Sequence, residues 1–332
     1  MKDIQYKIRG RESSIAILIV NFNSGHLIKQ CLQCLLVQTW IRTKIIVVDN
    51  ASTDNSMEGL EKSFPSVHFI FSQINLGFAA GNNLALNHAD GCDWVALINP
   101  DAFPEPTWLE NLANAANNKT EFDFFGSLMC AADQPGWLDG TGDVYHVSGL
   151  AWRRDHEVRT ELGTKTEGEI FGPCAAAAMY LRSALVKVGD FDEDYFCYYE
   201  DVDLAFRLRL QGYRCWYEPT AVVNHVGSGI TGKRSVFSTY HGHRNLVWTF
   251  FKNMPTSLLL IFLPWHLIMT LIAILVSALR GQGLIVIIAK LDALKAYKTI
   301  YKKRSSIQKS RTVGIFDLLL LMDRGVISFI KR

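Results

Sequence analysis

The chain has 332 residues, of which 49% are hydrophobic, and its formal net charge is +2. This is enough apolar material for one large α/β domain and a smaller addition. The seven cysteines are scattered and odd in number, which excludes a disulfide framework and fits reduced thiols in the cytosol. Residues 280–332 hold 12 basic against 3 acidic side chains beside Leu/Ile-rich stretches, which indicates a membrane-facing tail and argues against nucleic acid as the main partner.

Four short apolar runs in the first third of the chain predict β-strands. They are Ser14–Asn21, Lys44–Asp49, Val67–Ser72 and Trp94–Ile98. The segments between them have the length of helices, which we expect over Gly25–Gln38, Asp54–Phe64 and Gly81–Ala89. This alternation is typical of βα units and of a mostly parallel sheet with helices on both faces. Residues 1–13 are polar and lack the apolar core of a secretory signal, so we expect the main domain to stay in the cytosol.

The middle of the chain has a less regular pattern. Ala131–Gly168 is rich in Gly, Asp and Trp, which predicts a long loop or a loose β excursion. Regular structure is expected again over Ile170–Leu181, and Val202–Leu210 has the pattern of a helix. Met254–Leu279 contains no Asp, Glu, Lys or Arg and marks the start of an apolar tail.

Polar residues follow three of the predicted strands: Asn21–Ser24 ends the first run, Asp49 begins Asp-Asn-Ala-Ser-Thr-Asp at the end of the second, and Asn99-Pro100-Asp101 ends the fourth. Asn75–Asn83 separately places glycines and asparagines around a tight turn. Ligands of open α/β sheets bind beyond the carboxyl ends of the strands, so the three clusters predict one site. A carboxylate such as Asp101 can hold a divalent cation that bridges two phosphates. Helix capping and ordinary turns are the alternative explanation for each cluster.

A second group of candidate residues lies further along the chain. Glu200, Asp201 and Asp203 crowd three carboxylates at the start of a helix, and their repulsion should raise the pKa of at least one of them. Favourable acidic residues in the first helical turn are the alternative. His225 ends a later apolar stretch, where it could serve as a metal ligand or be structural.

In this order and spacing, the motifs resemble glycosyltransferase family 2, and within it the rhamnosyltransferase-like subset. The match covers roughly residues 14–245. It comprises Ile19–Asn23, Val47–Ser52, Asn75–Ala79, Gly81–Asn83, Leu97–Asp101, Val188–Asp192, Tyr195–Leu204 and Gly212-Tyr213. The resemblance implies a GT-A fold over 14–250, followed by an apolar, basic helical tail over 251–332. It also implies a nucleoside-diphosphate sugar as donor, with rhamnose from dTDP-rhamnose suggested by the subset, and inversion at the anomeric carbon.

The resemblance further implies a role for each matching residue. Asp49 would recognise the base beside the loop of Asn21 and Asn23. The nucleotide would be lined by Asn75, Gly77, Asn82, Asn83 and Asn99. Asp101 and His225 would bind Mg²⁺ or Mn²⁺. Asp201 would be the general base, supported by Glu200.

Together these assignments describe transfer of one sugar to an acceptor hydroxyl. Asp201 would remove the proton while the metal stabilises the departing diphosphate. Single transfer is favoured over polymerisation because the Gln-x-x-Arg-Trp element of processive synthases is missing, with His243-Arg244-Asn245 near its expected position. Trp137 and Trp152 could stack on acceptor sugar or simply lie in the core or on the surface. A nucleotidyltransferase is the alternative enzyme, but Asn21–Gly25 lacks a basic phosphate loop. A non-catalytic sugar-binding protein would have no reason to keep Asp101, Asp201 and His225.

The tail suggests how the enzyme reaches its acceptor. Met254–Leu279 is long enough to cross a bilayer, which takes about 20 apolar residues. A single crossing would place Lys302, Lys303 and other basic residues outside, against the positive-inside rule. Pro255 and Pro264 predict a broken or re-entrant helix. We therefore expect entry into the cytoplasmic leaflet beside a saccharide or polyprenyl-diphosphate-linked acceptor. Packing on the domain or on a second subunit, and a true span, are the alternatives.

Overall fold

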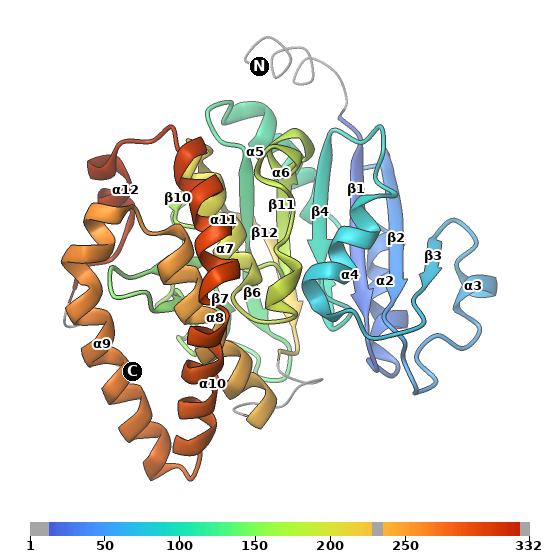
Figure 1. Ribbon diagram of the computed structural model, residues 1–332. Helices are drawn as coiled ribbons and strands as arrows, with labels where there is room; N and C mark the ends of the chain where they lie inside the picture. Colours follow the sequence, from blue (N-terminus) through green and yellow to red (C-terminus); the bar gives the residue numbers. More distant parts are fainter. Residues whose placement is uncertain (1–12, 228–234, 326–332) are drawn as a thin grey trace.

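The computed structural model describes residues 13–227 and 235–325 (Figure 1). The polar segment expected over 1–13 thus lies almost wholly outside the described residues. Within them, a central sheet follows the order β10-β12-β6-β11-β4-β1-β2-β3, with β5 paired to β12 and β7 to β6. The strands are β1 Ile15–Asn21, β2 Thr43–Asp49, β3 His68–Phe71, β4 Trp94–Ile98, β5 Ala102–Pro104, β6 Phe124–Ala131, β7 Leu138–Gly140, β8 Asp143–Tyr145, β9 Ala151–Arg153, β10 Gly168–Ile170, β11 Ala177–Leu181 and β12 Cys215–His225.

The first half of the sheet confirms the four predicted strands. Strands β3, β2, β1 and β4 are all parallel, and every residue of β1 and β4 is buried. Helix α4 packs on β1 and β2, and helices surround the sheet (Figure 1). The carboxyl ends of β1, β2 and β4 therefore meet at one edge, which is the lower edge in Figure 1. The α/β class with a mostly parallel sheet is confirmed.

The second half of the sheet is mixed. Strand β11 runs antiparallel between β4 and β6, and β12 is parallel to β6. The short strand β5 pairs antiparallel with the end of β12, with Ala102 opposite His225. This pairing joins the segment after β4 to the end of β12, which is far away in sequence. In the middle segment, β7, β8 and β9 confirm a loose β excursion.

The helices of the domain differ from the predicted ones at their ends. They are α2 Leu27–Leu36, α3 Leu60–Ser63, α4 Gly77–Leu86, α5 Trp108–Asn118, α6 Arg182–Val188, the 3₁₀ turn η1 Glu193–Tyr195 and α7 Glu200–Leu210. Helix α3 is much shorter than the predicted Asp54–Phe64, because the Asp54 carboxylate accepts from the backbone of Gly25 and Ser56 and holds a turn. Helix α4 starts four residues before Gly81, at a turn closed by the side chain of Asn75.

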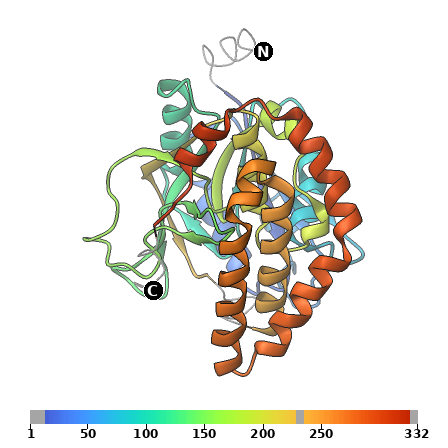
Figure 2. The same cartoon turned by 60° about the vertical axis from the view of Figure 1, so that its left-hand side comes forward.

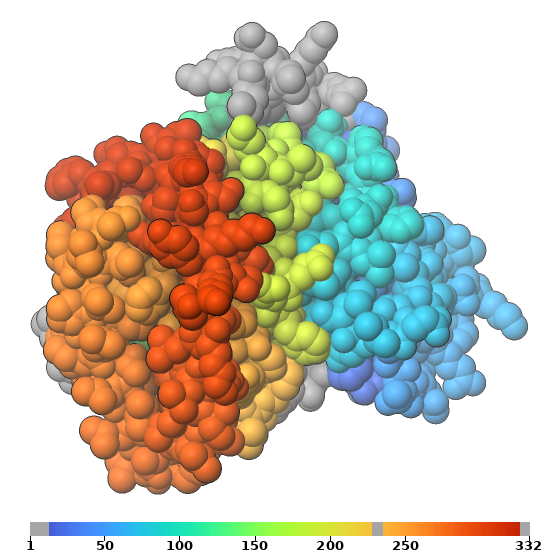
Figure 3. Space-filling view, in the orientation of Figure 1, coloured from blue at the N-terminus to red at the C-terminus, as the bar shows by residue number. Residues whose placement is uncertain are grey.

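In the described part of the chain, five helices follow the sheet and cover one flank of the molecule (Figures 2 and 3). They are α8 Val236–Asn253, α9 Thr256–Leu279, α10 Gly283–Lys295, α11 Tyr297–Ser310 and α12 Ile315–Leu321. The prediction of a broken helix at the prolines is wrong. Pro255 is the N-cap of α9, and Pro264 lies on its exposed face, where the helix continues with the loss of one N–H donor.

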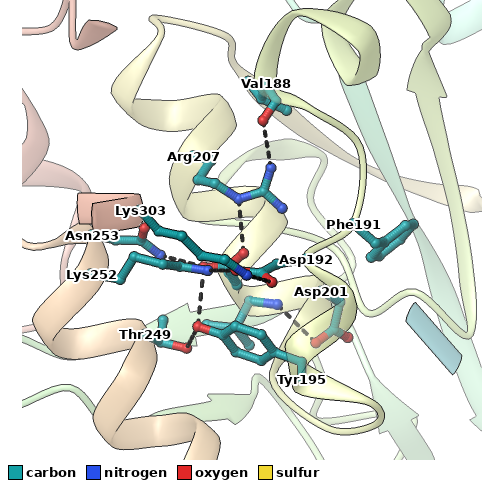
Figure 4. Close-up of polar contacts among 12 residues, drawn as sticks. Val188, Phe191, Asp192, Tyr195, Asp201, Arg207, Thr249, Lys252, Asn253 and Lys303 are labelled. Carbon is teal, nitrogen blue, oxygen red and sulfur yellow. Dashed lines mark hydrogen bonds and ion pairs between the residues drawn. The ribbon is translucent and has the colours of Figure 1, made fainter. Parts of the chain in front are cut away.

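Buried charges fasten this flank to helix α7 (Figure 4). The Lys252 ammonium of α8 is fully buried and lies 2.5 Å from Asp192 and 2.8 Å from Asp203. Arg207 donates to Asp203 at 2.8 Å, one turn along α7. Lys303 of α11 also pairs with Asp192. Burial alone would raise the pKa of Asp192 and of Asp203, but these cations outweigh it and lower both.

We predict that Lys252→Met lowers the free energy of unfolding by about 3–5 kcal/mol, because it leaves buried carboxylates without their partner. The exposed Lys295, whose side chain is 77% accessible, is the matched control, and Lys295→Met should leave the unfolding midpoint close to that of the wild type, because exposed ion pairs contribute little. Urea unfolding followed by circular dichroism measures both. The pairing stabilises the fold above the ordinary carboxyl pKa and is lost as the pH falls, so the difference between wild type and Lys252→Met should shrink in acid. Equal unfolding midpoints at neutral pH would contradict this account.

Candidate functional site

A cavity of about 710 Å³ opens at the carboxyl edge of the parallel strands. The turns after β2 and β4 and the start of α7 line it. The predicted site residues that line it are Asn75, Gly77, Asn99, Asp101, Glu200, Asp201 and His225. The sequence motifs, up to 150 residues apart, therefore do form one site. A smaller cavity of about 280 Å³ adjoins it behind His225.

The first strand-end cluster is a buried network beside the cavity. Asn21 donates to the Asp49 carboxylate at 3.1 Å, and Ser52 N–H donates to the same carboxylate at 3.3 Å. Asn23 adopts a φ of 48° and accepts from Thr53 N–H at 2.7 Å. None of Asn21, Asn23 and Asp49 is among the described cavity-lining residues; Asn50 is. Base recognition by Asp49 stays a prediction.

The turn before α4 is built by amide side chains. Asn50 accepts from Leu76 N–H at 2.8 Å and donates to the Asn75 side chain at 2.9 Å. Gly77 has a φ of 80°, and a Cβ there would lie 2.5 Å from the Phe196 carbonyl oxygen. Only glycine satisfies both the conformation and this close approach. The turn before α4 thus contacts the loop that precedes α7.

Asn82 and Asn83 have structural contacts. Asn82 donates to the Phe78 carbonyl at 2.9 Å within α4. Asn83 donates to the Phe191 carbonyl at 2.9 Å and accepts from Phe191 N–H at 3.0 Å. Neither is among the described residues that line the cavity. Their predicted contact with the nucleotide is therefore untested, and their visible role is to join α4 to the segment after α6.

Asp101 and His225 meet because β5 pairs with the end of β12. The His225 Nε2 atom lies 3.3 Å from Asp101 Oδ1, and both side chains are buried. Its Nδ1 atom lies 2.7 Å from Asp139 Oδ2. Burial opposes protonation of His225, but the two carboxylates outweigh it and raise its pKa to about 9. The same contacts, helped by Arg153, hold the pKa of Asp139 at about 2 against burial.

These residues fit a divalent cation. Within the part of the chain that the structure describes, Asp101 Oδ1 and His225 Nε2 are buried with no polar partner besides each other, and Asn99 Oδ1 is buried without a hydrogen-bond partner. A carboxylate oxygen and an imidazole nitrogen are ligands of Mn²⁺-type ions, and a carboxylate on the other ring nitrogen is the usual support of a metal-bound histidine. Residues 13–227 and 235–325 contain no group of three His, Cys, Asp or Glu side chains suited to a metal. Further ligands would have to come from the substrate or from solvent.

Asp201 and Glu200 line the same cavity from the start of α7. Asp201 accepts from the N–H groups of Ala175 at 3.2 Å and Val202 at 2.8 Å. Burial raises the pKa of Asp201 above its usual value despite these bonds. Burial and the neighbouring Asp201 raise the pKa of Glu200 strongly, and its Oε2 atom has no hydrogen-bond partner. The pKa of Asp203 is lowered instead, because this carboxylate faces Lys252 behind the cavity.

Three charged residues of the site were missed by sequence reasoning. Asp139, Asp143 and Arg153 all come from the irregular middle segment. Asp143 lines the cavity, and burial together with Asp201 raises its pKa. Arg153 lines both cavities and pairs with Asp139 at 2.5 Å. The abundance of Asp and Trp in that segment was the available signal. Trp152 also lines the cavity, whereas Trp137 lines the smaller one.

The loop that presents Glu200 is strained. Phe196, Tyr198 and Tyr199 all have φ between 64° and 68°. Cys197 N–H donates to the Tyr195 carbonyl at 2.7 Å, which closes a γ-turn of the rarer form. Asn245 of α8 is fully buried and donates to the carbonyls of Cys197 at 2.9 Å and Tyr198 at 2.7 Å. Helix α8 thus holds this conformation in place.

Known proteins resemble the chain over most of its length. The N-acetylglucosaminyl-diphospho-decaprenol L-rhamnosyltransferase of Mycobacterium tuberculosis is 27% identical over 244 residues, which are 66% of this chain and 78% of that protein. The poly-beta-1,6-N-acetyl-D-glucosamine synthase of Staphylococcus aureus is 25% identical and covers 73% of this chain and 58% of the synthase.

Solved structures share the fold. The mannosyltransferase PcManGT from Pyrobaculum calidifontis, in complex with GDP-Man and Mn²⁺, has a TM-score of 0.52 at 18% identity and covers 91% of this chain and 87% of its own. GalNAc-T7 with UDP, GalNAc and Mn²⁺ has a TM-score of 0.58 at 12% identity over 71% of this chain and 47% of its own. The family model described as Glycosyl transferase family 2 matches residues 16–189. The chain belongs to glycosyl transferase family 2 and is a glycosyltransferase with a GT-A fold.

Proposed function

We propose that the enzyme transfers one sugar, with inversion, from a nucleoside-diphosphate donor to an acceptor hydroxyl. The observation that carries the proposal is that one cavity is lined by Asp201, a candidate base, and by Asp101 with His225, a candidate metal pair. The similarity to the mycobacterial rhamnosyltransferase favours dTDP-rhamnose as donor and a polyprenyl-diphosphate-linked saccharide as acceptor. We place the reaction at the cytoplasmic face of a membrane, in cell-surface polysaccharide synthesis, with residues 14–250 as catalytic domain and 251–332 as tail.

In the proposed reaction, Asp201 accepts the proton of the acceptor hydroxyl. The acceptor oxygen forms a bond to the anomeric carbon as the bond from that carbon to the diphosphate oxygen breaks. The raised pKa of Asp201 suits a base, since its carboxylate binds a proton more readily than an exposed aspartate does. Asp101 and His225 would hold Mg²⁺ or Mn²⁺, which neutralises charge on the leaving diphosphate. Glu200 and Arg153 would set the charge around Asp201.

The base assignment is tested by Asp201→Asn, which keeps the size of the side chain and removes its basicity. Turnover should fall by about two or more orders of magnitude, while donor affinity changes little. The measurement is release of nucleoside diphosphate from a set of nucleotide sugars with Mn²⁺ and an acceptor, alongside nucleotide binding. Asp90→Asn, an exposed aspartate, is the control. Near-normal turnover of Asp201→Asn would rule this base out.

Removal of the metal should abolish the activity. We expect turnover to vanish with excess chelator and to return with Mn²⁺ or Mg²⁺, because the diphosphate leaves poorly without a cation. Asp101→Ala should weaken binding of the nucleoside diphosphate as well as the rate, measured by calorimetry with Mn²⁺ present. Full activity in chelator would refute the metal role of Asp101 and His225 together.

The pH dependence of kcat/KM should change when the positive charge of Arg153 is removed. The activity requires ionised Asp201, so it should fall as the pH drops through the raised pKa of that group. Arg153 lowers the pKa of Asp201, and Arg153→Gln should therefore move the acid limb of kcat/KM to higher pH. Arg182→Gln, which removes a partner of Asp190 outside the cavity, should leave the limb in place. An unmoved limb in Arg153→Gln would contradict Asp201 as the titrating base.

A further inference from the structure

An exposed apolar face runs along the full length of α9 and continues on α10. We name it the apolar stripe; it consists of Leu260, Ile261, Leu267, Ile268, Leu271, Ile272, Leu275, Val276 and Leu279 of α9 with Leu284, Ile287, Ile288 and Leu291 of α10. These positions recur every three or four residues, so they share one side of each helix. Figures 2 and 3 show the two helices on the outside of the molecule. A contiguous apolar surface of this kind marks an interaction site.

The charges around the stripe fit a lipid bilayer as its occupant. Between Lys252 and Lys290, Arg280 is the one Lys, Arg, Asp or Glu residue. Exposed tyrosines and lysines then follow where α10 passes into α11, namely Lys295, Tyr297, Lys298, Tyr301 and Lys302. Tyrosines and lysines beside an apolar surface are typical of residues at the head-group level of a membrane. A second protein subunit would not require this sequence of apolar, aromatic and basic side chains.

The inner side of α9 is already occupied by the protein. Leu258 is buried in the core of the domain, and Leu259, Phe262, Leu263 and Trp265 pack against that core. The His266 ring stacks on Phe250 with centroids 4.1 Å apart. Of the helices in residues 13–227 and 235–325, α9 alone is long and apolar enough to cross a membrane. With these contacts, the first half of α9 has protein on one side and exposed apolar residues on the other. Contact on one side is what its packing allows.

The backbone of the turn between α9 and α10 is internally hydrogen-bonded, and the turn carries one charged side chain, the exposed Arg280. Gly281 has a φ of 73°, and the N–H groups of Gly281 and Gln282 donate to Ala278 and Ser277 carbonyls at 3.0 and 2.8 Å. These bonds satisfy the carbonyls at the end of α9. A Cβ on Gly283 would lie 2.9 Å from Ala278, so the helices meet closely at this point. Few polar backbone groups would be left unpaired when the turn enters lipid.

The stripe adjoins the mouth of the catalytic cavity. Helix α8 packs on α10, and Thr239 donates to the Gln282 side chain at 3.0 Å. Phe237, two residues earlier on α8, lines the cavity and lies 6.1 Å from the rings of Phe196 and Tyr198. The α9–α10 turn and the carboxyl ends of the parallel strands lie at the same end of the molecule (Figure 1). One helix therefore connects the cavity wall to the stripe.

We propose that the apolar stripe lies in one leaflet of a bilayer as a one-sided anchor, with the cavity mouth at Phe237 turned to acceptors held in that same leaflet. The proposal rests on the proposed function only for the acceptor, which would be an amphiphile with a saccharide head and a long apolar chain. The anchor itself follows from the stripe, the aromatic and basic residues beside it and the packed inner side of α9.

The test uses the full chain with the double substitution Leu271→Glu and Leu275→Glu, whose side chains are 62% and 65% exposed, and Leu162→Glu as matched control at 78% exposure. Binding to sedimented vesicles of phosphatidylcholine, with and without phosphatidylglycerol, is measured. We expect the double substitution to weaken binding about tenfold or more, since it removes two leucines from lipid and would bury two carboxylates. The control should bind like wild type. Phosphatidylglycerol should strengthen the binding of the wild type and of the control.

Activity and topology complete the test. The double variant should keep its unfolding midpoint and its turnover of a water-soluble acceptor, but lose turnover of an acceptor embedded in vesicles. A reporter fused after Arg332 should stay on the cytoplasmic side. Vesicle binding that is absent in wild type or unchanged in the variant overturns the anchor, as does a reporter found outside. A wild-type dimer that the substitutions dissociate assigns the stripe to a second copy instead. Failure of the proposed function would appear differently, as no donor turnover in any variant.

Discussion

The arrangement of the site depends on ion pairs that lie behind it. Asp201 and Asp203 share one turn of α7, yet Asp201 faces the cavity and Asp203 is fully buried against Lys252 and Arg207. Asp192 joins the same cluster through Lys252 and Lys303. These contacts fix the rotation of α7 about its axis. Glu200 and Asp201 are therefore held in buried positions, and burial is the main cause of the raised pKa of each.

The loop before α7 shows the same dependence in its backbone. Residues held at such positive φ cost about 1–3 kcal/mol each, and three of them lie between Phe196 and Tyr199. Asn245 of α8 donates hydrogen bonds to the loop, and Gly77 allows the turn before α4 to approach it closely. Asp201, the turn at Asn75 and helix α8 are thus parts of one packed unit. A change in any of them should alter the position of Asp201.

Much of this site was predictable because strand ends are easy to locate. Apolar runs place Asn99 and Asp101 at the end of β4, and the carboxylate cluster at Glu200 is visible as a motif. The meeting of His225 with Asp101 depends on the pairing of β5 with β12, which no local pattern reports. Asp139 and Arg153 come from a segment without periodicity. Pro264 was misinterpreted as a helix break, because its position on the exposed face of α9 is a tertiary property.

The cluster at Lys252 has a practical consequence for anyone who purifies this enzyme. An apolar C-terminal tail invites its removal to gain solubility. However, the cations that the tail supplies to Asp192 and Asp203 are Lys252 of α8 and Lys303 of α11, and both lie after residue 251. Helix α8 also donates hydrogen bonds to the loop before α7. A shortened protein ending near residue 250 would lose Lys252 and Lys303, which pair with Asp192, and would leave Arg207 as the cation beside Asp203. Detergent, or polar replacements restricted to the outward side of α9, would preserve the catalytic centre where truncation would not.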